Sequence, residues 1–325
     1  MAEPILEVQN LCTHLPTKRG LVRAVDGVSF SVRPGEIVGV VGESGCGKST
    51  LCFSLVRLLP DTAQHSGRIL FRGEDLLAKS REEMRAIRGK DITMVLQNPM
   101  TALDPVYTVG NQLREILRFN ADMTPGERTR RAIEMLRQVH IPSPEERLEN
   151  YPHQMSGGMK QRVLTAMATG LKPGLLLADE PTTALDVTIQ EQILGLFAEI
   201  RDRLGTAIIL VTHDLGVVRR LCDRVLIMYA GRIIETGETE AIFQEPQHPY
   251  TRALLASIPK MGEERARLQA IAGQIPDLTG LPPGCSFEPR CPHAMEICRT
   301  TYPPAFARGP GREARCWLHE EAGAT

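Results

Sequence analysis

The feature that most constrains the fold of this chain is a glycine-rich stretch at residues 42–49, Gly-Glu-Ser-Gly-Cys-Gly-Lys-Ser. It fits the pattern G-x-x-x-x-G-K-[ST], in which glycines let backbone N–H groups point inward and cradle phosphates. The sequence predicts a buried strand before it, from Glu36 to Val41, and a helix after it, from Lys48 to about Leu59. Because a helix N-terminus also attracts anions, this arrangement predicts a phosphate-binding loop, which we call the P-loop.

Two side chains of the P-loop have specific expected roles. Lys48 places a point charge between the β- and γ-phosphates of a nucleoside triphosphate, and the Ser49 hydroxyl is a ligand for Mg²⁺. The residues expected to contact the nucleotide in this segment are Gly42, Glu43, Ser44, Gly45, Cys46, Gly47, Lys48, Ser49 and Thr50.

Short β-branched runs alternate with helical stretches through the first 240 residues, which favours a largely parallel sheet covered by helices. From about residue 98 to residue 155 the strand signals disappear, so we expect a helical insertion there. A hairpin turn is expected at Ala230–Gly231. Further strands are predicted at 92–96, 175–178, 207–211 and 224–229.

Overall composition excludes some classes of protein. The 325 residues are 42% hydrophobic, enough for a sizeable core, and the net charge of -1 gives no reason to expect a nucleic-acid partner. We see no signal peptide, and no apolar run approaches the roughly 20 residues that cross a bilayer. We therefore expect a soluble, cytoplasmic chain.

Two adjacent carboxylates end the predicted strand at 175–178. Asp179 and Glu180 lie where α/β sheets carry their ligands, and a proline follows them. Asp179 would bind Mg²⁺ through water, and Glu180 would act as general base on the attacking water. Helix capping alone is the alternative interpretation of this acidic pair.

Four further motifs complete a resemblance to the ABC ATPases, which covers about residues 1 to 245. Ser156-Gly157-Gly158-Met159-Lys160-Gln161-Arg162 resembles their signature, and Gln97 their Q-loop glutamine. Thr183-Ala184-Leu185-Asp186 resembles the D-loop, and His213 the switch histidine. The resemblance implies an α/β fold with a RecA-like core, an antiparallel β edge and a helical subdomain at about 98–162. It also implies a domain at 1–247 and a small, irregular, cysteine-rich extension at 248–325.

Two segments narrow the resemblance to the ATPases of dipeptide and oligopeptide importers, and within them to the first of the two usually encoded together. They are residues 97–105, Gln-Asn-Pro-Met-Thr-Ala-Leu-Asp-Pro, and residues 248–251, His-Pro-Tyr-Thr. The implied function is an ATP-hydrolysing subunit at the cytoplasmic face of the membrane. The alternatives are a nickel-chelate or glutathione importer, a soluble ABC ATPase acting on nucleic acid or ribosomes, and a non-catalytic nucleotide-gated module.

The family resemblance also implies how the site works. Ser156 and the amides of Gly157 and Gly158 close over the γ-phosphate bound by a second ATPase chain, which is a homologous chain or another copy. Gln97 contacts Mg²⁺ and the attacking water, and His213 contacts the γ-phosphate and Glu180. The other implied partners are two transmembrane permease subunits and, indirectly, an extracytoplasmic substrate-binding protein.

Two positions depart from the wider family. Met159 replaces the more usual glutamine, and no aromatic residue lies between Met1 and Val28 to stack on adenine. Arg19 is the candidate for stacking by cation–π contact, and a solvated loop arginine is the alternative. The remaining histidines, which we expect to be ordinary polar residues, are His14, His65, His140, His153 and His319.

Half of the eight cysteines lie in the last 41 residues, as C-x5-C-x6-C-x17-C at Cys285, Cys291, Cys298 and Cys316. No close C-x2-C pair of the usual zinc type is present, and the spacing is not that of a ferredoxin. A [4Fe–4S] cluster, which the importer resemblance favours, a zinc ion with His293 as a substitute ligand, and free or oxidised thiols remain open. A bound metal would supply folding energy to this Pro- and Gly-rich tail.

Overall fold

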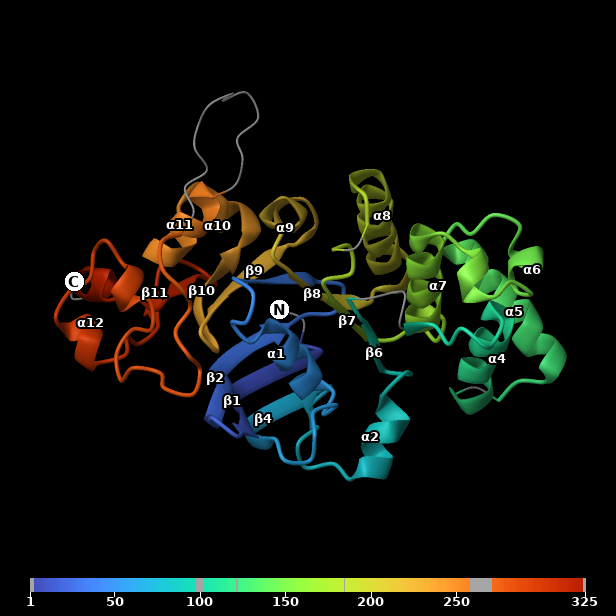
Figure 1. Cartoon of the computed structure of the whole chain (residues 1–325), viewed down its shortest axis with the longest axis horizontal. Coiled ribbons are helices and arrows are strands. Elements are labelled where there is room, and N and C mark those ends of the chain that lie inside the picture. The colour runs from blue at the N-terminus through green and yellow to red at the C-terminus, as the bar shows by residue number, and fades with distance from the viewer. Residues whose placement is uncertain (1–2, 98–101, 121, 184, 258–270, 324–325) are drawn as a thin grey trace. The chain divides into compact units, whose positions relative to one another are not determined.

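A computed structural model describes residues 3–97, 102–120, 122–183, 185–257 and 271–323. The chain divides into two compact units. Unit 1 comprises residues up to 5, 32–37 and 78–210, and unit 2 comprises 6–31, 38–77 and residues from 211 onward. Figure 1 shows the chain and labels those elements for which the view has room.

Unit 2 contains an antiparallel sheet in the order β2-β1-β4-β5. In β1 the buried apolar residues Leu6 and Val8 alternate with less buried ones, as expected for a sheet with one face on a core, and Leu11 is buried after an irregularity between Gln9 and Cys12. The strands are β1 (Leu6–Thr17), β2 (Gly20–Val32), β4 (Gln64–Phe71) and β5 (Glu74–Asp75).

A second set of strands in unit 2 carries the P-loop. β3 (Ile37–Val41) is buried along its whole length and pairs in parallel with β9 (Arg224–Tyr229). β9 turns through Ala230 and Gly231, both with positive φ, into the antiparallel β10 (Arg232–Glu238). The short strands β12 (Glu313–Ala314) and β11 (Phe306–Ala307) extend this edge.

Among the residues that the structure describes, five helices and two 3-10 helices complete unit 2. The C-terminal tail contributes only short elements to it, in agreement with the irregular extension predicted from its composition. The elements are α1 (Lys48–Leu55), α9 (Leu215–Leu221), α10 (Thr239–Gln244), α11 (Pro249–Ala256), α12 (Ile297–Thr300), η2 (Glu288–Arg290) and η3 (Trp317–Gly323).

Unit 1 contains strands and a helical region. β6 (Ile92–Val95) pairs in parallel with β7 (Leu175–Asp179), and β8 (Ala207–Thr212) follows β7 in the sheet. β7 is buried along its whole length, and its last residue, Asp179, lies at the carboxyl end of the strand. The helical elements are α2 (Arg81–Ile87), α4 (Val109–Asn120), α5 (Pro125–Gln138), α6 (Pro144–Arg147), η1 (Pro152–Gln154), α7 (Gly157–Thr169) and α8 (Val187–Leu204).

The predicted strands, the helical insertion and the hairpin are confirmed, but the helix after the P-loop is shorter than expected. It ends at Leu55 and not near Leu59, because Arg57 adopts a left-handed conformation with φ 51°. The Arg57 guanidinium donates to the Leu76 carbonyl at 3.0 Å, a tertiary contact that helical periodicity does not report. In the part of the chain that the structure describes, no helix has the length and apolarity needed to cross a membrane.

Candidate functional site

The P-loop adopts a backbone path that only glycine permits at two positions. Gly47 has φ +107°, and a Cβ there would lie 2.0 Å from the Ala24 carbonyl oxygen. A Cβ on Gly42 would lie 2.2 Å from the Met228 carbonyl oxygen. Glycine is therefore required at positions 42 and 47 because any side chain there would collide with the backbone of β9 or β2.

Lys48 is the first residue of α1 and is 5% exposed. Its ammonium donates to the carbonyl oxygens of Gly42 at 2.8 Å and Glu43 at 3.0 Å, so it lies back over the loop that precedes it. Ser49 and Ser44 are exposed beside it. Burial raises the pKa of the Cys46 thiol, despite nearby Lys48, so this thiol is held in its neutral, unreactive form.

His213 and Arg19 are the other predicted nucleotide contacts in unit 2. His213 follows β8 and is exposed, directly before Asp214, whose carboxylate caps α9 by accepting from the Gly216 and Val217 N–H groups. Arg19 is exposed in the turn between β1 and β2.

In unit 1 the structure brings Gln97 and Glu180 together across 83 residues of sequence. Gln97 Nε2 donates to Glu180 Oε2 at 2.9 Å, and Thr183 Oγ1 donates to the same oxygen at 2.9 Å. Glu180 has φ 46°, an uncommon backbone conformation for a non-glycine residue. Asp179, one residue earlier at the end of β7, is 5% exposed. The arrangement presents a carboxylate whose position is fixed from two sides.

The predicted signature lies at the start of α7. Ser156 is the N-cap: its hydroxyl accepts from the Met159 N–H at 3.3 Å. Ser156 and Gly157 are exposed, whereas Gly158 is buried, and a Cβ on it would lie 2.7 Å from Ile189 Cγ2 of α8. In the D-loop segment, Asp186 caps α8. Ala184 of that segment, and residues 98–101 of the importer motif, lie outside the described residues.

The four tail cysteines line one cavity in unit 2, together with His248, Phe287 and His293 among others. All eight cysteines of the chain, each within the described ranges, have free thiols. Burial raises the pKa of Cys285 to about 12 and that of Cys316 to about 11, and the pKa of Cys291 is also raised. Each of these three sulfurs has a backbone N–H directed at it, from Phe287, Leu318 and His293 respectively.

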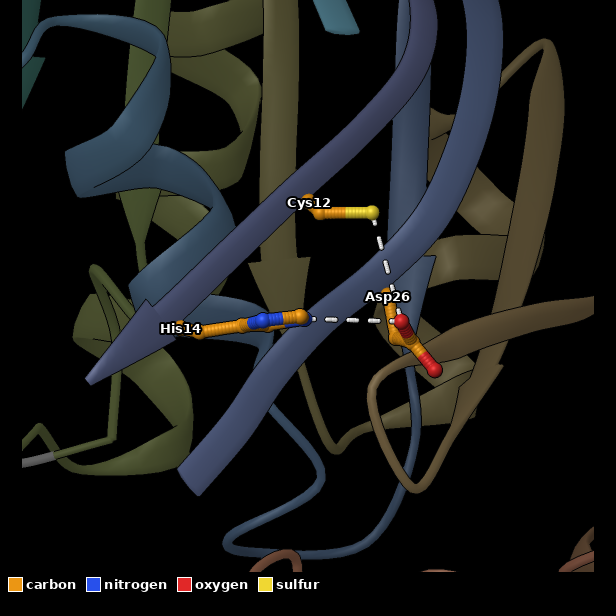
Figure 2. Close-up of side chains that lie close together, drawn as sticks. All are labelled: Cys12, His14 and Asp26. Atoms are coloured by element: carbon orange, nitrogen blue, oxygen red, sulfur yellow. Dashed lines mark hydrogen bonds and ion pairs between the residues drawn. The ribbon is translucent and has the colours of Figure 1, made fainter. Parts of the chain in front are cut away.

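A second group of possible ligand atoms was not anticipated from the sequence. Figure 2 shows Cys12 and His14 of β1 directed at Asp26 of β2, with Sγ, Nε2 and a carboxylate oxygen within 4.8 Å of one another. His14 Nε2 lies 3.5 Å and Cys12 Sγ 3.9 Å from Asp26 Oδ1. The other Asp26 oxygen accepts from Arg232 Nε at 3.0 Å and Nη2 at 2.7 Å.

The Arg232 guanidinium, which pairs with Asp26, accounts for the charge of this cluster without a metal ion. Burial opposes ionisation of Asp26, but bonds from Arg232 and His14 outweigh it and lower the pKa of that carboxyl. The Arg232 guanidinium also lies 3.9 Å from the Tyr302 ring centroid. Because Arg232 already compensates the carboxylate, we interpret the cluster as an ion-pair network that joins β1, β2 and β10 to the tail.

Comparison with known proteins agrees with this geometry. Residues 25–183 match the family described as ABC transporter, and residues 234–298 match the C-terminal region of oligopeptide/dipeptide transporters. The chain is 50% identical over 321 residues to a dipeptide transport ATP-binding protein of Bacillus subtilis, covering 98% of this chain and 96% of that protein.

Two further similarities extend this result. An oligopeptide transport ATP-binding protein of Salmonella typhimurium is 46% identical over 316 residues, covering 97% of this chain and 94% of that protein. Among solved structures, a dimeric ATP-binding cassette in a post-hydrolysis state with ADP and phosphate has a TM-score of 0.65 and 28% identity. That match covers 72% of this chain and 98% of the other.

Proposed function

The chain belongs to the ATP-hydrolysing subunits of ABC transporters, and from this premise we propose that it powers a membrane importer of dipeptides or oligopeptides. The substrate class is supported by near full-length similarity to dipeptide and oligopeptide transport proteins. The match of residues 234–298 to the C-terminal region of oligopeptide/dipeptide transporters supports it independently of the ATPase motifs.

The contact that carries the proposed chemistry is the pair of hydrogen bonds on Glu180 Oε2. A fixed carboxylate can accept a proton from water as its oxygen attacks the γ-phosphorus, while the bond to the β–γ bridging oxygen breaks to give ADP and phosphate. In this proposal Gln97 orients the attacking water, His213 donates to the γ-phosphate, and Lys48 compensates charge on the β- and γ-phosphates.

The residues assigned to Mg²⁺ offer the oxygen donors that this ion prefers. Ser49 supplies a hydroxyl, Gln97 an amide oxygen and Asp179 a carboxylate that is 5% exposed. Mg²⁺ held by these residues would reduce the negative charge on the phosphate oxygens. We propose that Asp179 reaches the ion through a water molecule.

We propose that two ATPase chains enclose each nucleotide. The solved cassette of similar fold is dimeric, and Ser156 and Gly157 stand exposed at the N-terminus of the 13-residue helix α7. A serine hydroxyl and helix N-terminal amides are suited to a γ-phosphate held by the partner. The partner is a second copy or a homologous chain, and Arg19 is the proposed contact for adenine.

The remaining proposed partners are two permease subunits, which in turn receive peptide from an extracytoplasmic binding protein. Val106 and Tyr107, which are 70% and 53% exposed, lie shortly after Gln97 at the start of the helical region. Exposed apolar side chains of this kind fit a docking surface for a membrane subunit. We propose that the chain binds peripherally at the cytoplasmic face of the membrane, where ATP is present.

We propose that the four tail cysteines hold a [4Fe–4S] cluster, with zinc as the alternative. They share one cavity, and three of them have N–H groups directed at sulfur, an interaction that stabilises metal-bound thiolates. A single zinc with bonds of about 2.3 Å would draw its sulfurs to about 3.8 Å apart. Among the described residues no three cysteine sulfurs lie within 4.8 Å of one another, so the tail sulfurs are spaced more widely than a single zinc requires.

The proposed domain division follows from these roles. Residues 1–247 form the ATPase domain, with the helical subdomain at about 98–162, and residues 248–325 form the cysteine-bearing extension. The extension begins at His248, which caps α11 by accepting from the Tyr250 N–H at 3.0 Å.

Transport by the assembled system tests the proposed function. The chain is copurified with its membrane neighbours and reconstituted in liposomes with ATP inside, and uptake of di- and oligopeptides, glutathione and a nickel chelate is compared. We expect ATP-dependent uptake of peptides that Lys48→Ala abolishes. Uptake of only the chelate or glutathione would refute the peptide assignment, and copurification without membrane subunits would refute the importer.

A visible absorption spectrum of the same preparation tests the tail. A broad visible absorption band of the kind that iron–sulfur clusters give, lost in the Cys291→Ser variant, supports the cluster. A colourless protein that contains zinc in stoichiometric amount supports the alternative. Neither metal in anaerobically prepared protein would refute both proposals.

A further inference from the structure

A buried arginine side chain of the C-terminal extension, Arg290, contacts the P-loop. Arg290, at the end of η2, has a side chain that is 4% exposed. Its Nη1 donates to Glu43 Oε2 at 2.7 Å and its Nη2 to Glu43 Oε1 at 3.0 Å, which is a bidentate ion pair across 247 residues of sequence. Glu43 is the second residue of the P-loop.

The other donors of Arg290 are also used. Nη1 donates to the Tyr229 hydroxyl at 3.3 Å, Nη2 to the Ile271 carbonyl at 3.2 Å, and Nε to the Ala272 carbonyl at 2.8 Å. A guanidinium has five N–H groups in a fixed fork, and here all five have acceptors. The position and orientation of Arg290 are therefore fully determined, and a lysine could not reproduce them.

Glu43 is held at its backbone as well as at its side chain. Its N–H donates to the Tyr250 hydroxyl at 2.9 Å, and its carbonyl oxygen accepts from the Lys48 ammonium at 3.0 Å. One residue thus connects two side chains from beyond residue 247 to the lysine that we assign to the phosphates. Among the contacts of the described residues, hydrogen bonds of Glu43 connect Arg290 to Lys48.

An aromatic cluster fixes the support behind these contacts. The ring centroids of Tyr229, Tyr250 and Phe287 lie 4.7 to 5.5 Å from one another, and each ring is at most 2% exposed. Phe287 lies three residues before Arg290 and between Cys285 and Cys291 in sequence. The segment that carries Arg290 is therefore anchored in the core of unit 2 on one side and in the four-cysteine cavity on the other.

Charge explains why such a contact matters for a nucleotide site. An acidic side chain in a loop that receives a polyphosphate repels the ligand unless its charge is compensated. A partly buried ion pair such as Glu43–Arg290 compensates that charge with less screening by salt than an exposed pair. The bidentate geometry also directs the carboxylate toward Arg290.

We propose that Arg290 and Tyr250 are positioning residues for the P-loop, which neutralise and orient Glu43 so that the C-terminal extension is a required part of the nucleotide site. This inference rests on the proposed binding of ATP at residues 42–49. It assigns no contact between Arg290 and the nucleotide, because its five donors are already used within the chain.

A double-mutant cycle on the full-length chain tests the proposal. The Kd for a fluorescent ATP analogue with Mg²⁺, the KM for ATP and kcat are measured for Arg290→Gln, Glu43→Gln and the double variant. We expect Arg290→Gln alone to raise Kd and KM by tenfold or more, with a smaller change in kcat. In the Glu43→Gln background the same substitution should change Kd by less than threefold, because no unpaired carboxylate remains.

Three further variants separate positioning from stability. Tyr250→Phe keeps the ring but removes the acceptor for the Glu43 N–H, and it should raise Kd for the analogue by about threefold at unchanged Tm. Arg290→Lys should restore only part of the affinity. Arg299→Gln is the matched control, since Arg299 pairs with Glu288 in the same tail but is 70% exposed, and its Kd should match that of the unaltered chain.

Equal loss of affinity from Arg290→Gln in both Glu43 backgrounds would overturn the proposal, as would a lower Tm with unchanged Kd. If Arg290→Gln does not fold, Tyr250→Phe decides, and an unchanged Kd in that variant overturns the proposal. Failure of the unaltered chain to bind the analogue would instead refute the proposed function. The two failures are thus distinguishable in one set of measurements.

Discussion

Replacement of Glu180 by glutamine is the sharpest test of the chemistry proposed for this chain. The Glu180 Oε2 atom accepts from Gln97 Nε2 and from Thr183 Oγ1, each at 2.9 Å. A glutamine can place its carbonyl oxygen at the same point and accept both bonds. Because the two side chains have the same shape, neither the left-handed backbone at residue 180 nor the local packing needs to change.

The expected loss is therefore the loss of a proton acceptor. General-base catalysis contributes about 10²- to 10⁴-fold to a rate, which corresponds to about 2.7 to 5.4 kcal/mol of transition-state stabilisation. We expect kcat for ATP hydrolysis in Glu180→Gln to fall within that range. The Kd for ATP and the Tm should be unchanged, since binding and packing use other groups.

Phosphate release at saturating ATP and Mg²⁺ measures this effect, and nucleotide binding is measured on the same preparation. Thr183→Val is the matched control, because it removes one hydrogen bond from Glu180 but leaves the carboxylate, and it should lower kcat by less than tenfold. A kcat for Glu180→Gln within fivefold of the unaltered chain would refute the assignment of Glu180 as general base. Loss of ATP binding in that variant would refute the claim that its role is purely chemical.

Three further substitutions test other parts of the structure. Gly47→Ala would place a Cβ 2.0 Å from the Ala24 carbonyl oxygen at a φ of +107°, so we expect loss of measurable ATP binding, and retained affinity would contradict the observed loop. Gly158→Ala would press on Ile189 Cγ2 at 2.7 Å and should lower the free energy of unfolding by about 1 to 3 kcal/mol, and replacing Ile189 by alanine as well removes Cγ2 and should make the added cost of Gly158→Ala smaller. Asp26→Asn should destabilise the chain at neutral pH. Because the pKa of Asp26 is lower in the folded chain, its carboxylate stabilises the fold above the unfolded pKa of about 3.9, and this stabilisation is lost as the pH falls through the folded pKa. Chemical unfolding of Asp26→Asn at pH 7 and pH 3 should therefore show a difference from the unaltered chain that shrinks on acidification, and a constant difference would contradict the network drawn in Figure 2.

Features encoded by neighbouring residues were predictable from the sequence. The strands at β3, β7 and β9 are runs of apolar residues buried along most of their length, and length and flanking residues are enough to identify such runs. The P-loop was predictable because glycine, lysine and serine at fixed spacing satisfy a local backbone requirement. The motif order also indicated the ABC transporter family.

Contacts between distant residues were not predictable in this way. Glu43 was expected to contact the nucleotide and Arg290 had no predicted role, yet the two side chains form a partly buried bidentate pair. His14 was expected to be an ordinary polar histidine, and its approach to Asp26 depends on how β1 and β2 are aligned. The end of α1 was placed too late because a contact of Arg57 with the Leu76 carbonyl decides it.

The sequence by itself determined the local units of this protein: its strands, the helical insertion, the phosphate loop and the order of its motifs. These features depend on hydrophobic periodicity and on backbone freedom over a few neighbouring residues, and both can be determined from the amino-acid sequence alone. Only the tertiary structure decided which charges meet, above all that the tail compensates the acidic residue of the P-loop. Ion-pair and hydrogen-bond partners are set by the alignment of strands and turns that lie hundreds of residues apart, and no local pattern records that alignment.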